Sequence, residues 1–155
     1  MQGARFTLWV IWGTLLASLS IYAGLPLVMA PFGDVMEGGA EALRLCLGLV
    51  AIATAVASFV LKRVLVLGPI ARNAIDPNTP AGARRIQTGY LFTWVLAESI
   101  GIYGLLLYFL THEMGSLLAF VGGSALLLLL HAPRASDVDQ APGSHDVASR
   151  PDPIG

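Results

Sequence analysis

One carboxylate, Glu98, lies near the middle of a long apolar run that covers residues 89–110. A run of about 20 residues is what a helix needs to cross the hydrocarbon of a bilayer. An ionised carboxylate at that depth is expensive, so such a residue persists where a proton, a cation or a polar partner neutralises it. The chemistry that Glu98 predicts is therefore the binding of a proton or a metal cation inside a membrane.

Hydroxyl groups near Glu98 complete its candidate ion-binding site. Ser99 follows it directly, Tyr103 lies five positions later, and Thr54 is expected at the same depth in a second apolar run. A protonated carboxyl needs one acceptor and one donor, whereas a dehydrated cation needs several oxygens. The second run offers Thr54 and Ser58 but no Gln or second Glu. We therefore expect H⁺ as the carried ion rather than Na⁺, with Glu98 neutral because burial disfavours the charged form.

No other chemistry has a motif in this chain. His112 and Glu113 are adjacent, but no further histidine follows at the spacing of a zinc ligand. A glycine-rich phosphate loop and a nucleophile with its base are also absent from the sequence. We expect no catalytic constellation, no metal, no organic cofactor and no nucleic-acid partner. The single cysteine, Cys46, lies in an apolar run and leaves no intramolecular disulfide.

The elements that position Glu98 are predicted from composition. Hydrophobic residues make up 55% of the chain and charged residues 12%, with a mean hydropathy of +0.72, which is far more apolar than a soluble domain. Backbone polar groups in lipid must be satisfied within the chain, so each apolar run is expected to be a helix. The fold class is therefore all-α and integral to the membrane, with residues 1–131 forming antiparallel helical hairpins. Four transmembrane helices are expected, at about residues 6–30, 43–67, 88–110 and 114–131.

The charged residues predict the orientation of these helices. The loop between the second and third runs holds five basic residues against the single acid Asp76, whereas the loop between the first and second runs holds acids and no base. Positively charged loops stay on the cytoplasmic side. Both termini are then cytoplasmic in a multi-pass protein of a bacterial-type inner (plasma) membrane. The five basic residues are Lys62, Arg63, Arg72, Arg84 and Arg85.

The composition changes sharply after His131. Residues 132–155 are rich in Pro, Ser, Asp and Gly and contain no aromatic residue. Such a segment cannot bury enough apolar surface to fold alone, so a disordered cytoplasmic tail is predicted.

A weak internal repeat relates the first apolar run to the third. Matching Ile21-Tyr22 to Ile102-Tyr103 also pairs Ser18 with Ser99 and puts Ala17 in the place of Glu98. Internal repeats of membrane proteins are often detectable only as faint similarity of this kind. The repeat indicates a doubled helical hairpin in which one copy lacks the carboxyl.

The second and third runs together resemble a known family. Alanines alternate at positions 51, 53, 55 and 57, and small side chains of this kind let helices approach closely in lipid. The loop sequence Ile70-Ala71-Arg72-Asn73 precedes Ala97-Glu98-Ser99-Ile100-Gly101-Ile102-Tyr103-Gly104-Leu105. Residues 43–110 are therefore similar to subunit c, the proteolipid of F-type and V-type ATPases.

This resemblance implies a function and a set of roles. Glu98 matches the ion carrier of that family, and Arg72 matches the loop arginine that contacts a partner subunit. The lipid bilayer and either further copies of the chain or other membrane subunits are the implied partners. The chain departs from the family in its four helices and in carrying the carboxyl on the third. Two functions follow as expectations, namely a proton-translocating, subunit c-like proteolipid, and a non-translocating four-helix membrane protein with a structural or assembly role.

Overall fold

The structure is a computed structural model, and it describes residues 2–29, 38–72, 74 and 79–133, apart from the side chains of residues 2–5. Within these ranges the chain is helical and contains no strand, which confirms the all-α prediction. The elements are α1 (Gln2–Val28), α2 (Ala40–Leu61), the π-helix η1 (Lys62–Leu67), α3 (Gly68–Ala71), α4 (Pro80–Thr111) and α5 (Met114–Leu130).

Three helical segments of the described chain are long and apolar enough to cross a membrane. They are Phe6–Val28 in α1, Ala40–Ala71, which joins α2, η1 and α3, and Pro80–Thr111, which is α4. The apolar helix α5 is shorter, at 17 residues. Since three spanning segments are available, the chain has the features of a multi-pass membrane protein.

Helix α4 begins earlier than its apolar run. The run was expected to start at residue 88, but the helix starts at Pro80, with Thr79 accepting a hydrogen bond from the Gly82 N–H at 3.1 Å. A threonine cap followed by proline at the first position is a favourable helix start. The helix therefore extends through Arg84 and Arg85, which need no apolar surroundings. The predicted tail is described only at residues 132 and 133, and residues 134–155 lie outside the described part of the chain.

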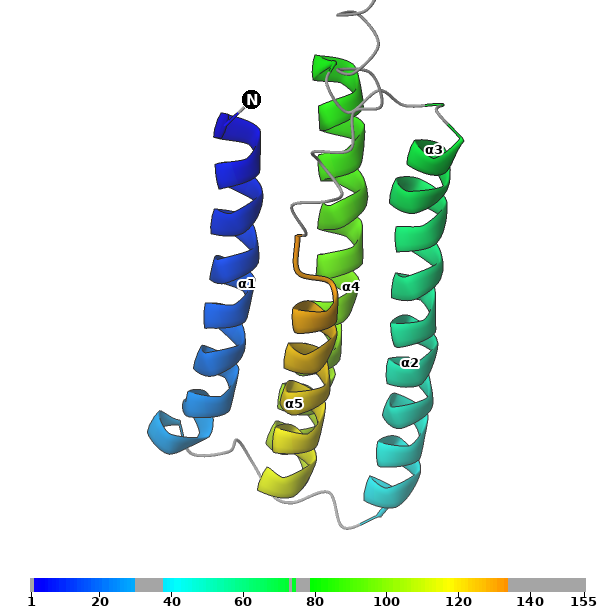
Figure 1. Cartoon of the computed structure of the whole chain (residues 1–155). Coiled ribbons are helices and arrows are strands. Elements are labelled where there is room, and N and C mark those ends of the chain that lie inside the picture. Colours follow the sequence, from blue (N-terminus) through cyan, green and yellow to red (C-terminus); the bar gives the residue numbers. More distant parts are fainter. Residues whose placement is uncertain (1, 30–37, 73, 75–78, 134–155) are drawn as a thin grey trace, which may run out of the picture.

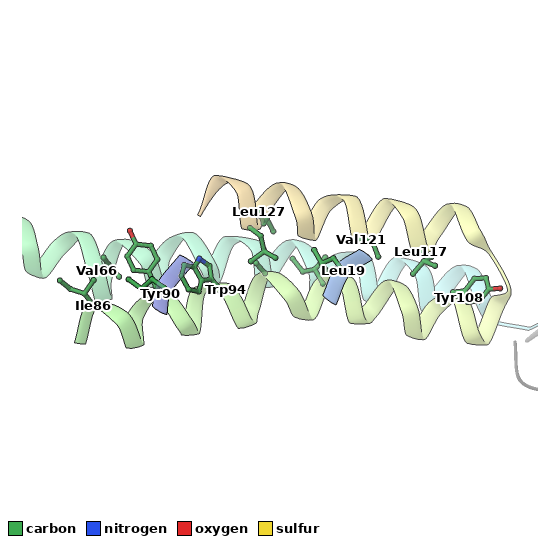
Figure 2. Close-up of a cluster of buried hydrophobic side chains, with 13 residues drawn as sticks. Leu19, Val66, Ile86, Tyr90, Trp94, Tyr108, Leu117, Val121 and Leu127 are labelled. Atoms are coloured by element: carbon green, nitrogen blue, oxygen red, sulfur yellow. The ribbon is translucent and has the colours of Figure 1, made fainter. Parts of the chain in front are cut away.

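Helix α4 is the central element of the bundle, because it contacts α1, α2, η1 and α5 (Figure 1). The buried side chains of the bundle core, among them Tyr90 and Trp94, are spread along the length of α4 (Figure 2). Glycines let the neighbouring helices approach. A Cβ atom on Gly104 would lie 2.5 Å from Phe120 Cβ, and one on Gly89 would lie 2.7 Å from Val66 Cγ2.

The two ends of the bundle differ in how their charged residues are paired. Arg44 of α2 forms an ion pair with Glu113, which lies in the short turn between α4 and α5. Ser116 also donates a hydrogen bond to the Glu113 carboxylate, at 2.9 Å. The basic residues of η1, of the C-terminus of α3 and of the first turns of α4 lie at the opposite end of the bundle, which is the end where α1 begins (Figure 1).

Candidate functional site

Glu98 lies on α4 at the edge of the face that packs against the rest of the bundle. Its neighbour Ala97 is fully buried and Ile100 is 5% exposed, whereas Glu98 itself is half-buried. The carboxyl group turns toward α1 and makes its hydrogen bonds there. A helix from the other end of the sequence therefore provides the immediate surroundings of the mid-span carboxyl.

Two hydroxyl groups of α1 contact the same oxygen of Glu98. Ser18 Oγ lies 2.5 Å from Glu98 Oε1, and the Tyr22 hydroxyl donates to that oxygen at 3.0 Å. Ser18 and Tyr22 are four positions apart, so they lie on one face of the helix. Ser18 Oγ also lies 2.7 Å from the carbonyl oxygen of Leu15 in its own helix. Leu15 O, Ser18 Oγ, Glu98 Oε1 and Tyr22 Oη thus form a continuous chain of polar atoms.

Apolar contacts hold α1 in this position. Leu19, the residue after Ser18, is only 3% exposed. It packs against Gly101 of α4, where a Cβ atom would lie 2.7 Å from Leu19 Cδ2. Nearer the N-terminus, the indole N–H of Trp12 donates to the Leu128 carbonyl of α5 at 2.9 Å. The absence of a side chain at Gly101 therefore brings the α1 backbone close enough for Ser18 to reach Glu98.

Helix α5 fixes the neighbouring face of α4, since a Cβ atom on Gly101 would also lie 3.5 Å from Ser124 Oγ. Ser124 is fully buried and donates to the Ala97 carbonyl at 2.6 Å. The indole N–H of Trp94 donates to the His131 carbonyl at 2.9 Å. Hydrogen bonds between helices rigidify a bundle in lipid. The backbone that carries Glu98 is thus fixed one residue and one helical turn before the carboxyl.

None of the three predicted partners of Glu98 forms a hydrogen bond with it within the described residues. Ser99 donates to the Leu96 carbonyl at 2.8 Å, and Thr54 donates to the Val50 carbonyl at 2.8 Å. Serine and threonine hydroxyls in helix interiors commonly bond to their own backbone in this way. Tyr103 is half-buried, and within the described residues no hydrogen bond joins it to Glu98.

Tyr22 was not predicted as a site residue, although the sequence contained a signal for it. The internal repeat aligns Ser18 and Tyr22 with Ser99 and Tyr103, so both helices carry a serine followed four positions later by a tyrosine. The predicted site used the pair on the helix that carries Glu98. The structure brings the other pair to the carboxyl. Ser99 and Tyr103 are one and five positions after Glu98 on the same helix and therefore point away from it, whereas the side chains of a neighbouring helix can point toward it.

The alternating alanines divide between two faces of α2, because residues two apart on a helix do not share a face. Ala51 and Ala55 line a groove of about 340 Å³, whose other walls include Ala119 and Gly123 of α5. Ala53 is exposed and Ala57 is half-buried. Arg72, the predicted partner contact, is exposed at the C-terminus of α3.

The groups beside Glu98 are hydroxyls, each of which can donate one proton and accept others. Across the described residues, no three His, Cys, Asp or Glu side chains gather as a metal site would need. Comparisons with protein-family models, with curated proteins and with solved structures found no match to this chain.

Proposed function

We propose that this chain is a membrane protein that binds and releases a proton on Glu98, in the manner of a subunit c-like proteolipid. The observation that carries this proposal is the contact of one serine hydroxyl with two oxygens. Ser18 Oγ is within hydrogen-bond distance of both the Leu15 carbonyl and Glu98 Oε1. A serine hydroxyl holds a single proton.

A count of protons supports a neutral Glu98. The Leu15–Ser18, Ser18–Glu98 and Tyr22–Glu98 contacts each need one proton, and the two hydroxyls supply two. The carbonyl of Leu15 can only accept. All three contacts are hydrogen bonds at once when the carboxyl supplies the third proton, which it donates to Ser18 Oγ. The 2.5 Å separation is at the short end of the range for a bond between two oxygens.

Release of that proton requires a change in the contacts of α1. An ionised Glu98 would need both hydroxyls as donors, so Ser18 would rotate its proton away from the Leu15 carbonyl. The protonated and ionised forms thus differ in the direction of one hydroxyl rotor. Ser18 and Tyr22 are positioned to stabilise both forms, which is what a reversible proton carrier needs.

The membrane arrangement is part of the same proposal. Helix α5 has 17 residues, which is the lower end of the range of about 17–25 residues for a spanning helix, and we take it as a fourth span. The basic end of the bundle, with both termini, is cytoplasmic by the distribution of lysine and arginine. The membrane is then a bacterial-type inner membrane.

A rotor role is the most specific form of this function. Several copies of the chain would form a ring, with Arg72 exposed for contact with another subunit. The proton on Glu98 would be exchanged with that partner assembly. The support for this form is the resemblance over residues 43–110 together with the exposed position of Arg72.

Labelling with a hydrophobic carbodiimide tests the proton on Glu98, since this reagent reacts with protonated carboxyls. We expect Glu98 to be modified in lipid at neutral pH, more slowly as the pH rises, and Na⁺ to give no protection. Glu41 is the matched control, because it is exposed in the first turn of α2, and we expect the reagent to leave it unmodified. Protection by Na⁺ would reverse the choice of ion, and no reaction of Glu98 at any pH would overturn the proposal.

A structural role is the second candidate, and one observation favours it. Helix α1 of the same chain already provides two polar partners to Glu98, as expected for a carboxyl that serves only to join helices. Infrared spectra distinguish the two functions. A carrier loses its protonated carboxyl band over an accessible pH range, and the loss is absent in Glu98→Gln. A structural carboxyl keeps its band at every pH at which the protein stays folded.

A further inference from the structure

A groove at the basic end of the bundle is not used by the Glu98 site. It has a volume of about 610 Å³ and follows α2, η1 and α3 over residues 59–72. Three cationic side chains line it, together with two apolar side chains and two small residues. The cations are Lys62, Arg63 and Arg72, and the others are Phe59, Leu67, Gly68 and Ala71.

The π-helix brings two of these cations to one surface. Arg72 follows Arg63 by nine positions, which in a regular helix of about 3.6 residues per turn would put the two on opposite faces. In η1 the Gly68 N–H bonds to the Arg63 carbonyl, five positions back. This wider turn holds an extra residue and rotates everything after it. Arg72 is thereby carried round toward the face of Arg63.

The walls of the groove are fixed by neighbouring helices. The ammonium group of Lys62 lies 5.5 Å from the centre of the Tyr90 ring, and Tyr90 is fully buried on α4. The Phe59 ring lies 4.7 Å from the ring of His131, which is also fully buried. Lys62 and Phe59, on the two walls of the groove, are therefore each in contact with a buried residue.

The two arginines of the groove have no acidic counterpart among the described residues. Arg63 and Arg72 are exposed, and neither forms an ion pair with any carboxylate of the described residues. Lys62 is the first charged residue after the apolar run of α2, so the groove lies where that helix leaves the hydrocarbon. Phe59 and Leu67 are 49% and 43% exposed and offer apolar surface beside the cations.

We propose that this groove binds an anionic phospholipid. The phosphate is held by Arg63 and Arg72, with Lys62 beside it. The part of the acyl chain nearest the headgroup lies against Phe59 and Leu67. Arginine suits this task because its planar donors match phosphate oxygens in pairs. Basic pockets on the cytoplasmic side of membrane helices bind such headgroups. The inference is independent of the proton chemistry of Glu98, and it assigns Arg72 to lipid in place of the subunit contact that the rotor form gives it.

Native mass spectrometry of the delipidated protein tests the proposal by titration with phosphatidylglycerol or with phosphatidylcholine. We expect one phosphatidylglycerol to bind more tightly than phosphatidylcholine. An Arg or Lys near anionic lipid contributes about five-fold in affinity, so Arg63→Gln with Arg72→Gln should weaken phosphatidylglycerol binding roughly 25-fold. The double variant Arg84→Gln with Arg85→Gln is the matched control, since both arginines are exposed at the same end but outside the groove.

The control should keep wild-type affinity. Equal loss in both double variants would indicate attraction to the basic end as a whole and overturn the site. Equal affinity for the two lipids would overturn the role of charge. Displacement of phosphatidylglycerol by inorganic phosphate alone would assign the groove to a soluble anion instead. If the double variant does not fold, Arg63→Gln alone should show about a five-fold loss.

Discussion

The hydroxyl oxygen of Ser18 lies 2.5 Å from the carboxyl oxygen of Glu98, and this contact joins α1 to α4. A change in the charge of Glu98 therefore acts first on its hydrogen bonds to α1. Helix α1 packs against the core through the buried Leu8 and Leu19 and through partly buried residues such as Leu15 and Leu16, and this polar contact adds to that packing. The state of the carboxyl and the packing of the first helix are thus coupled.

Removal of the tyrosine hydroxyl should weaken the attachment of α1. Tyr22→Phe deletes the 3.0 Å hydrogen bond to Glu98 and keeps the ring. Polar contacts between membrane helices contribute about 0.6 kcal/mol on average and about 1.7 kcal/mol at most, and we expect a loss in this range. The free energy of unfolding in mixed micelles measures it.

Tyr103→Phe is the matched control for that substitution. Tyr103 occupies the equivalent place in the repeat, and no hydrogen bond joins it to Glu98 in the described structure. Removal of the Tyr103 hydroxyl should leave the free energy of unfolding within about 0.5 kcal/mol of the wild type, as for other changes away from a specific contact. A larger effect of Tyr103→Phe than of Tyr22→Phe would contradict the arrangement of the site.

Most of the fold could be predicted from the sequence, for a physical reason. Apolar runs long enough to cross lipid have to be helices, so α1, α2, α4 and α5 follow from composition. The helix bounds were less predictable, because apolarity ends where lipid ends, whereas a helix ends at its caps. Helix α4 accordingly continues through polar residues as far as the Thr79 cap.

The site was predictable in its carboxyl but not in its partners. Glu98 stands out because a charge in an apolar run needs a neutralising group. Which hydroxyls hydrogen-bond to Glu98 depends on how the helices are rotated about their axes. Small residues at the helix contacts determine that rotation. Gly101 admits Leu19 and so brings Ser18 and Tyr22 of α1 to the carboxyl. The sequence around Glu98 contains Gly101 but does not specify which helix packs against that glycine.

Gly104→Ala should destabilise the contact between α4 and α5. The added methyl group would lie 2.5 Å from Phe120 Cβ and 3.2 Å from the Leu117 carbonyl. Overpacking of this kind costs about 1–3 kcal/mol of unfolding free energy. Gly122→Ala on α5 is the control, since no atom lies within 4 Å of its added methyl group. Equal stability of the two variants would show that the helices are further apart than described.

The orientation can be measured by labelling single cysteines at two exposed positions. Ala81 lies at the start of α4 and Gly38 lies just before α2. The native Cys46 is exposed and has to be replaced by alanine first. We expect a membrane-impermeant maleimide to label position 38 and not position 81 in intact cells, because the basic loop stays cytoplasmic. External labelling of position 81 would reverse the proposed topology.

A ring of copies makes a prediction about one exposed alanine. Ala53 is exposed on α2 and is not among the residues that line the groove between α2 and α5, so we expect Ala53→Leu to leave the single copy intact but to add bulk between copies. If α2 helices pack closely in a ring, native mass spectrometry should find an oligomer for the wild type and smaller species for Ala53→Leu. Glu98→Gln should assemble like the wild type, since its amide keeps a similar shape.

Ala55→Leu is the comparison, because Ala55 lines the groove between α2 and α5 and its effect lies within one chain. A wild-type monomer would end the rotor form of the proposed function, and it would leave the proton chemistry of Glu98 to be decided by the carbodiimide reaction.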